Sequence, residues 1–268
     1  MSSDPTRRVA VVIPAKNEAE TIATTIRAAR AIQRVDLVIV VDDGSDDETQ
    51  HVARNAGAAV VRHAVNRGKA SAMETGAAVV AMRDIDNRPP RHLLFLDADL
   101  GESAVECNEL VTPVLEGRAD LAIAALPPQA GAGGRGFVVG AARKAIEKFT
   151  GWQPLQPLSG QRCLSREAYE VATPLSRGWG VETGMTIDVL RAGLTVIEVP
   201  CDLTHRATGN DLAGQLHRAG QYRDVMLAVT QRRVRTRAIP GEIIAQSAAM
   251  QRPGEPYRLN LRGASLPK

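Results

Sequence analysis

The chain has 268 residues, of which 44% are hydrophobic and only 3% aromatic, and its formal net charge is +3. This length allows one large α/β domain, and an aliphatic core of Ala, Val, Leu and Ile suits strands buried between helices better than an all-β sandwich. The small net charge gives no indication of a nucleic-acid partner. Three widely spaced cysteines, Cys107, Cys163 and Cys201, favour buried thiols over a disulfide framework or a zinc site.

Short aliphatic runs and amphipathic segments alternate through the first hundred residues. Strands are predicted at 9–13, 35–41, 58–62 and 92–96, and helices at 18–32, 46–56 and 69–82. Such β-α-β alternation predicts a mostly parallel, Rossmann-like sheet with helices on both faces, whose ligand site lies beyond the carboxyl ends of the strands. The polar segments 14–18, 42–49 and 97–99 all fall at such ends.

The remaining sequence predicts less regular elements. Helices are expected at 104–115, 137–149 and 182–191, and strands at 119–124 and 194–199. The segment 211–238 is rich in arginine and has apolar residues at helical spacing, which predicts a basic amphipathic helix. The segment 239–268 has several prolines and weak periodicity, and we expect a flexible tail there, as well as an N-terminal arm at 1–7.

Nothing in the sequence predicts a membrane-spanning segment. No apolar run approaches the roughly 20 residues that a transmembrane helix needs, and the start of the chain lacks the apolar core of a signal peptide. We therefore expect a cytoplasmic protein that contacts the inner face of a membrane at most peripherally, through the basic segment 211–237.

Two carboxylates one residue apart, Asp97 and Asp99, directly follow the strand predicted at 92–96. In a turn after a strand they point roughly the same way and offer the hard oxygen ligands that Mg²⁺ or Mn²⁺ prefers. A nucleotide diphosphate needs such a cation. An isolated Asp-x-Asp also occurs as turn or capping chemistry, but its position after a buried strand favours a metal site.

Two more polar segments follow predicted strands. Residues 42–49 read Asp-Asp-Gly-Ser-Asp-Asp-Glu-Thr, which is more acid than a helix N-cap needs and suits hydrogen bonds to ribose or uracil. Residues 14–18 read Pro-Ala-Lys-Asn-Glu, where an ordinary helix start explains Glu18 equally well.

Taken together, these segments resemble the family 2 glycosyltransferases, which use nucleotide sugars and have a single Rossmann-like domain called GT-A. The resemblance covers about residues 8–210 and implies a nucleotide-binding half at 8–100 and an acceptor half at 101–210. It also implies that Lys69 supplies charge to the leaving diphosphate. The residues that it places at the nucleotide sugar are Pro14, Ala15, Asn17, Glu18, Asp43, Ser45, Gly68, Lys69, Asp97 and Ala98.

The acceptor half resembles the glucosyl-3-phosphoglycerate synthases of this family. Pro-Leu-Ser-Gly-Gln-Arg at 157–162, Gly-Trp-Gly-Val-Glu-Thr-Gly at 178–184 and Thr-His-Arg at 204–206 have counterparts there in similar order. This likeness implies a sugar and acceptor pocket at Leu158, Ser159, Gly160, Arg162, Glu182 and Arg206, and a metal shell of Asp97, Asp99 and His205.

Two departures from the synthase pattern leave the acceptor open. The form Asp97-Ala-Asp-Leu100 is that of the dolichyl- and polyprenyl-phosphate sugar synthases, and Gln161 stands where the phosphoglycerate enzymes have an acid. The favoured interpretation is a metal-dependent transfer of a sugar, glucose above others, to a phosphorylated acceptor like 3-phosphoglycerate. We expect a UDP-sugar rather than a GDP-sugar as donor, Mg²⁺ or Mn²⁺ as cofactor, and Glu182 and Lys69 as the catalytic residues.

Three other interpretations are compatible with parts of the sequence. A polyprenyl phosphate could be the acceptor, at the cytoplasmic face of a membrane. From another functional class, the chain could be a non-catalytic nucleotide-sugar binder that serves a membrane protein, although the intact acidic segments favour catalysis. A nucleotidyltransferase would carry a glycine-rich segment after the first strand, where residues 14–18 have none. A homodimer is compatible with each interpretation.

Overall fold

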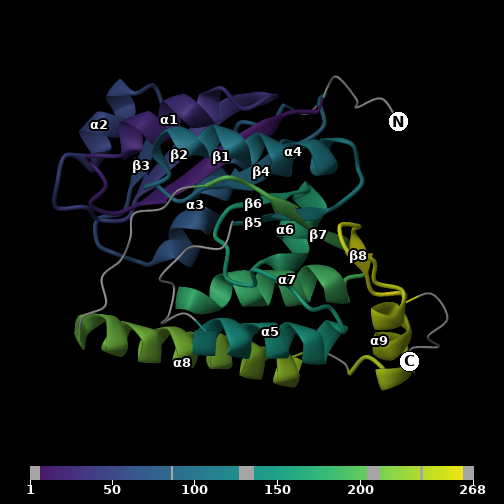
Figure 1. Cartoon of the computed structure of the whole chain (residues 1–268). Coiled ribbons are helices and arrows are strands. Elements are labelled where there is room, and N and C mark those ends of the chain that lie inside the picture. Colours follow the sequence, from purple (N-terminus) through teal and green to yellow (C-terminus); the bar gives the residue numbers. More distant parts are fainter. Residues whose placement is uncertain (1–6, 86, 127–135, 204–211, 236–237, 262–268) are drawn as a thin grey trace.

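The computed structural model describes residues 7–85, 87–126, 136–203, 212–235 and 238–261 (Figure 1). Within them, an eight-stranded sheet has the strand order β3-β2-β1-β4-β6-β5-β7-β8. The strands are β1 (Val9–Ala15), β2 (Val35–Asp42), β3 (Ala59–Arg62), β4 (His92–Phe95), β5 (Leu121–Ala125), β6 (Arg162–Leu164), β7 (Thr195–Pro200) and β8 (Tyr257–Arg258).

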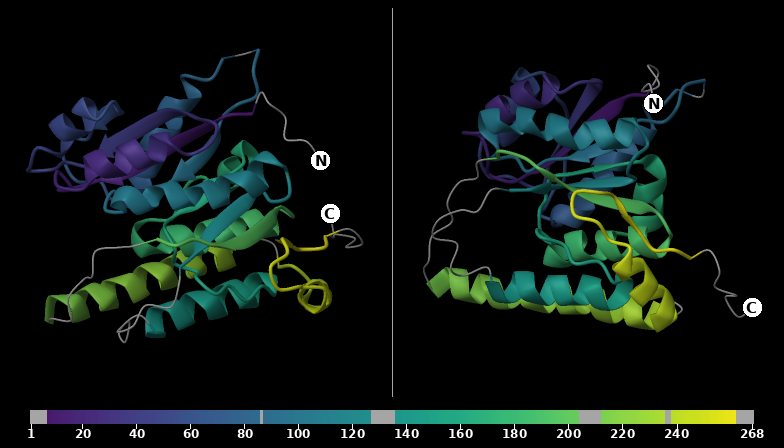
Figure 2. Two further views of the ribbon diagram at one scale, coloured as in Figure 1. Left: turned by 45° about the horizontal axis from the view of Figure 1, so that its top comes forward. Right: turned by 45° about the vertical axis from the view of Figure 1, so that its right-hand side comes forward.

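Helices cover both faces of the sheet, and one face carries a second helical layer (Figures 1 and 2). The first face is covered by α1 (Ile22–Arg30), α2 (Thr49–Asn55), the 3-10 helix η1 (Gly101–Cys107) and α4 (Asn108–Leu115). The other face is covered by α3 (Lys69–Ala81), α6 (Arg166–Ala172), the short η2 (Gly178–Gly180) and α7 (Val181–Arg191). Outside α7 lie α5 (Gly136–Thr150) and α8 (Leu212–Arg235), and α9 (Gly241–Ala249) lies beside the β8 edge.

The predicted mostly parallel α/β sheet is confirmed. Strand β1 pairs in parallel with β2 and β4, β2 with β3, and β5 with β7, and the β-branched residues of β1 are buried on both faces. Strand β6 was not predicted, because three residues show no periodicity, and it runs antiparallel to both of its neighbours. The three cysteines are free and buried, as expected.

The middle of α3 is held close to the middle of β1 by a glycine contact. A Cβ atom on Gly76 would overlap Cγ1 of Val12, so the backbone of α3 rests directly on β1. Only glycine allows so close an approach between a helix and a sheet. The contact fixes the height of α3 over the sheet and therefore the position of Lys69, its first residue.

The prediction of a flexible tail from residue 239 is wrong over residues 240–261. This segment forms α9 and then β8, which pairs antiparallel with the edge strand β7. Tyr257 is 3% exposed, stacks on Trp152 and donates a hydrogen bond to the carbonyl of Thr150. The prolines Pro253 and Pro256 lie in the connection between the two elements, where a proline breaks no ladder hydrogen bond.

The predicted basic amphipathic helix is present as α8. Within residues 220–232, whose side chains the structure describes, Val225, Ala228 and Val229 are buried against α5 and α7, so this part of the apolar side faces the protein. No helix in the described part of the chain has both the length and the apolar character that crossing a bilayer requires.

Candidate active site

An ion cluster at the carboxyl ends of the strands joins three of the predicted site residues. The Lys69 Nζ atom lies 2.8 Å from Asp97 Oδ1 and 3.2 Å from Glu182 Oε1. Lys69 begins α3, Asp97 follows β4, and Glu182 lies in the first turn of α7. The other Asp97 oxygen, Oδ2, accepts a hydrogen bond of 2.7 Å from Nε2 of Gln161.

The cluster is partly open to a ligand. The side chains of Lys69 and Asp97 are each 31% exposed, whereas that of Glu182 is only 6% exposed. Burial alone would lower the pKa of Lys69, but the charges of Asp97 and Glu182 outweigh it and raise that pKa. Lys69 is therefore a permanent cation at neutral pH, placed where a departing anion can reach it.

Gly160 forms the wall against which this ion cluster packs. A Cβ atom at this position would lie 2.6 Å from Asp97 Oδ2 and 2.7 Å from Lys69 Nζ. Both distances are shorter than any ordinary carbon contact, so a glycine is required for the observed pairing. The predicted Pro-Leu-Ser-Gly segment therefore lies in the same site as the Asp-x-Asp.

The turn that carries Asp97 and Asp99 is held by a threonine that the sequence did not single out. The buried Thr25 of α1 donates a hydrogen bond of 2.9 Å to the carbonyl of Ala98 and accepts one of 2.9 Å from the amide of Gly101. Asp99 itself is half-buried. Thr25 could have been found from the sequence as a polar residue on the apolar face of the predicted helix.

The two predicted nucleoside segments are joined by hydrogen bonds. Asn17 has a positive φ of 56°; its amide donates to Ser45 Oγ at 3.0 Å, and its side-chain oxygen accepts from the amide of Asp46 at 2.8 Å. The amide of Glu18 donates to Thr49 Oγ1 at 2.8 Å. Pro14 and Ala15 end β1 beside them, so the structure brings these predicted residues together at one edge of the sheet.

Asp43 links this edge to the ion cluster. Its carboxylate accepts hydrogen bonds from the amides of Arg67 and Gly68, at 2.8 and 2.7 Å, and lies 2.7 Å from Nδ1 of His63. Burial alone would raise the pKa of Asp43, but these three hydrogen bonds outweigh burial and lower it. The carboxylate thus fixes the segment that leads into Lys69. Apart from its position after a short predicted strand, nothing in the sequence indicates His63 as a site residue.

The predicted acceptor residues at 158–162 differ in their exposure to solvent. Leu158 is half-buried and packs against α5 and α8, while Ser159 and Arg162 are 5% and 1% exposed. The guanidinium of Arg162 donates to the carbonyls of Pro157, Ser159 and Glu182, at 2.8–3.0 Å. Burial lowers the pKa of Arg162 to about 10, which still leaves it charged at neutral pH.

The donor set fits a cation that arrives with a diphosphate. His205 and Arg206, implied for the metal shell and the acceptor, lie outside the described residues. Residues 7–85, 87–126, 136–203, 212–235 and 238–261 contain no group of three or more acidic, histidine or cysteine side chains that could enclose a metal. Mg²⁺ commonly needs only one or two carboxylates plus substrate phosphates. The Asp97 and Asp99 turn meets that requirement.

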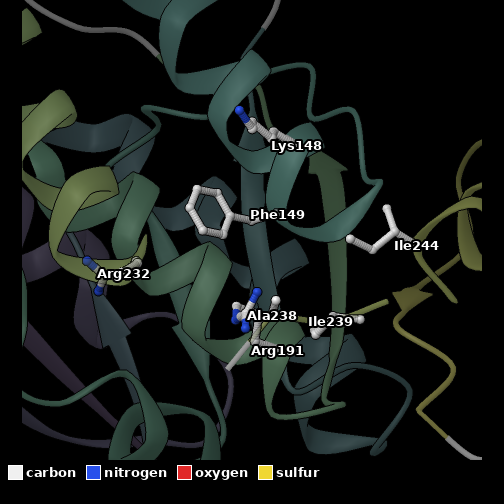
Figure 3. Close-up of a pocket in the computed structure, with 7 residues that line it drawn as sticks. All are labelled: Lys148, Phe149, Arg191, Arg232, Ala238, Ile239 and Ile244. Carbon is white, nitrogen blue, oxygen red and sulfur yellow. The ribbon is translucent and has the colours of Figure 1, made fainter. Parts of the chain in front are cut away.

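A separate cavity of about 420 Å³ lies between the ends of several helices (Figure 3). Neither Asp97 nor Glu182 lines it. It is lined by Lys148, Phe149, Arg191, Arg232, Ala238, Ile239 and Ile244. Its three cations stand near the carboxyl-terminal ends of α5, α7 and α8, where positive charge complements the helix dipoles. The cations of this cavity therefore have a structural explanation without a ligand.

The fold and the site define an α/β protein with a Rossmann-like sheet and a carboxylate and lysine cluster at the strand ends. The model of the glycosyl transferase family 2 matches residues 10–167, more than half of the chain, and the chain belongs to this family. Two curated relatives are the glycosyltransferase AglJ of Haloferax volcanii, 30% identical over 76% of the chain, and the glucosyl-3-phosphoglycerate synthase of Mycobacterium tuberculosis, 31% identical over 71%. The matches span 65% and 64% of these longer relatives, respectively.

Solved structures agree with this assignment. The glucosyl-3-phosphoglycerate synthase of Mycobacterium tuberculosis in complex with phosphoglyceric acid is 29% identical, with a TM-score of 0.66 over 84% of the chain and 80% of that protein. The same enzyme with Mn²⁺, UDP and glucosyl-3-phosphoglycerate gives a TM-score of 0.64 with the same coverage. The GT-A fold expected from the sequence is confirmed.

Proposed function

We propose that the chain transfers a glucosyl group from UDP-glucose to a phosphorylated acid of the 3-phosphoglycerate type. The observation that carries this proposal is the cluster of Lys69 with Asp97 and Glu182, set beside the hydrogen-bonded segments expected to hold a nucleoside. The mycobacterial relatives support the choice of donor and acceptor, because their structures hold UDP-glucose and phosphoglyceric acid.

In this proposal, the bond between the anomeric carbon and the diphosphate oxygen breaks, a bond from that carbon to an acceptor hydroxyl oxygen forms, and the proton of that hydroxyl passes to the departing diphosphate. Lys69 stabilises the negative charge that develops on the departing UDP. Asp99, with Asp97 beside it, would hold Mg²⁺ or Mn²⁺, whose positive charge supplies further stabilisation of the diphosphate when it is bound. The relative binds Mn²⁺ or Mg²⁺ together with UDP.

Glu182 and Arg162 have different roles in this proposal. Glu182 faces the cluster through its carboxylate and would position the hydroxyl groups of the donor sugar. Arg162 was predicted to contact the acceptor. Because its guanidinium is buried against three carbonyl groups, we propose instead that it fixes the acceptor segment against α7.

The lipid-phosphate alternative receives less support from the described residues. It rests on the form Asp97-Ala-Asp-Leu100 and on a basic amphipathic helix that could contact a membrane, and over residues 220–232 the apolar side of that helix is packed against α5 and α7. A membrane contact and a homodimer both remain expectations without an observation in their favour.

The test is an assay of UDP release and product mass with purified protein and Mg²⁺. UDP-glucose, other UDP-sugars and GDP-sugars serve as donors, and 3-phosphoglycerate or a short polyprenyl phosphate as acceptor. We expect transfer from UDP-glucose to 3-phosphoglycerate, a loss of about 100-fold or more in Asp99→Ala, and unchanged transfer in the exposed control Glu170→Gln.

Each other outcome corrects a stated part of the proposal. Transfer to polyprenyl phosphate alone would replace the acceptor and return the enzyme to the membrane face. A GDP-sugar as the preferred donor would replace the nucleobase. Donor binding without any release would contradict catalysis and favour the non-catalytic nucleotide-sugar binder.

A further inference from the structure

Helix α8 lies directly on the glycine-rich segment 178–184, the segment that carries Glu182 (Figures 1 and 2). A Cβ atom on Gly180 would lie 2.7 Å from the Cβ of Ala228 and 2.8 Å from the carbonyl oxygen of Asp224. A Cβ atom on Gly178 would overlap the carboxylate of Asp224. These glycines therefore let segment 178–184 approach α8 closely, with only the Ala228 methyl group and the Asp224 carboxylate at the contact.

The same contact continues along α7 one turn further. A Cβ atom on Gly184 would lie 2.6 Å from the guanidinium carbon of Arg232. The Arg232 guanidinium makes two hydrogen bonds to the carboxylate of Asp188 and one of 2.6 Å to Ser176 Oγ. Because positions 224, 228 and 232 are four residues apart, they form one face of α8.

This arrangement determines where Glu182 stands. Gly180 and Gly184 flank it in the sequence, and its backbone belongs to the turn that α8 contacts. The carboxylate of Glu182 must stay near the 3.2 Å that separates it from Lys69 if both are to act on one donor. A shift of α7 away from α8 changes that separation, because at Gly180 the backbone of the turn rests directly on the Ala228 methyl group and the Asp224 carbonyl.

We propose that α8 is a positioning element of the active site, in which Ala228 and Asp224 hold Glu182 at its working distance from Lys69. This inference rests on the proposed transferase function. According to this inference, Gly178, Gly180 and Gly184 form the surface against which α8 packs.

The first test is the substitution Ala228→Leu, with Gln231→Leu as the matched control. Both introduce the same side chain into α8, but Ala228 is 2% exposed and faces Gly180, whereas Gln231 is exposed. We expect Ala228→Leu to lower kcat by about tenfold to 100-fold, because displacements of about 1 Å have effects of this size. Binding of UDP, measured by calorimetry, should be unchanged, because the nucleoside segments belong to the other half of the domain.

The milder substitution Asp224→Ala keeps the test valid if the leucine variant does not fold. It removes the Asp224 carboxylate that lies against Gly178. The Oδ2 atom of this carboxylate also accepts a hydrogen bond of 3.4 Å from the amide of Trp179. Its control is Arg223→Ala, which removes an exposed ion pair with the same aspartate and leaves the docking contact intact. We expect a smaller loss of kcat in Asp224→Ala and none in Arg223→Ala.

Hydrogen exchange of the amides of residues 181–191 provides a readout that needs no activity. We expect faster exchange in Ala228→Leu and Asp224→Ala than in their controls. Unchanged exchange and kcat in both variants would overturn the inference, and so would a parallel loss of kcat and UDP binding, which indicates general damage. If the unmodified protein transfers no sugar, the proposed function fails, and the exchange data alone decide whether α8 holds α7.

Discussion

In the ion cluster, Asp97 and Lys69 can pair as they do because the neighbouring residue Gly160 has no side chain. Asp97 receives Lys69 on one oxygen and Gln161 on the other, and Gly160 lies against both Asp97 and Lys69. As an amide, Gln161 donates a hydrogen bond to Asp97, whereas a carboxylate at this position would repel Asp97. The charged groups of the cluster are the carboxylates of Asp97 and Glu182 and the amine of Lys69.

We expect Gly160→Ala to lower kcat by about tenfold or more while leaving the folded state intact. The added methyl group would fall 2.6 Å from Asp97 Oδ2 and 2.7 Å from Lys69 Nζ, so one of the two charged groups must move. Steady-state kinetics and a thermal melt of the same preparation measure the two effects. Gly140→Ala in α5 is the control, since a Cβ atom there meets nothing within 4 Å. Equal kcat values for the two variants would contradict the role of Gly160.

At the scale of the elements, α1 and the Asp-x-Asp turn form one unit through Thr25. Its hydroxyl group bridges the carbonyl of Ala98 and the amide of Gly101, so the turn cannot move without α1. The metal-binding carboxylates proposed above are therefore held from a helix on the opposite side of the sheet from α7. Their positions are fixed before any ligand arrives.

We expect Thr25→Val to weaken Mn²⁺ binding in the presence of UDP. The side chain keeps its shape but loses the hydroxyl, which leaves two buried backbone groups without their partner and costs about 1–3 kcal/mol. Calorimetric titration of Mn²⁺ into the UDP complex measures the loss of affinity. Thr25→Ser retains the hydroxyl and should retain most of the affinity. If valine binds Mn²⁺ as tightly as serine does, the threonine does not position the turn.

The elements were predictable where a local pattern decides them. The β-branched runs of β1 and β2 and the helix between them followed from composition and spacing alone, and so did the location of the site at the strand ends. The helices α6 and α9 are absent from the sequence predictions, and two short strands could not be predicted because the sheet itself creates them. Strand β6 is three residues that fill a gap between β4 and β5, and β8 is two residues that extend the β7 edge.

The same reasoning applies to the candidate site. Resemblance identified Lys69, Asp97 and Glu182 one by one, but their meeting in a single ion cluster depends on three elements far apart in the sequence. Patterns of single residues did not reveal that Arg162 is buried or that the glycines of residues 178–184 face α8. Both facts follow from tertiary contacts, which spacing along one segment does not encode.

For the whole molecule, the candidate active site and a network of ion pairs lie at opposite ends of the strands. The carboxyl ends of the strands carry the ion cluster. Near the amino end of β4, Arg91 pairs with Asp36 and Asp84, at 2.7 and 2.9 Å, and Arg166 also pairs with Asp84. This network ties together β2, β4 and α6. The half-buried His92 begins β4 there, and its two ring nitrogens are buried without a hydrogen-bond partner among the described residues.

We expect His92 to make the protein sensitive to acid. Burial, with the charges of Arg7 and Arg166, lowers its pKa to about 4, from 6.5 in an exposed histidine. The unfolded chain therefore binds a proton at this residue between pH 6.5 and pH 4, while the folded protein does not. The stability that depends on the neutral ring is complete above pH 6.5 and is lost as the pH falls towards 4. Between pH 7 and pH 5 the loss amounts to about 2 kcal/mol.

Denaturant unfolding at pH 7 and pH 5 checks this expectation. In His92→Leu the difference in unfolding free energy between the two pH values should shrink by about 2 kcal/mol, because the group that takes up the proton on unfolding is gone. The control His51→Leu removes an exposed histidine of α2 and should leave the difference as in the unmodified protein. If both variants lose stability in acid as the unmodified protein does, the acid sensitivity arises from carboxylates such as Asp36, whose pKa is lowered despite its burial by its pairing with Arg91 and Arg8.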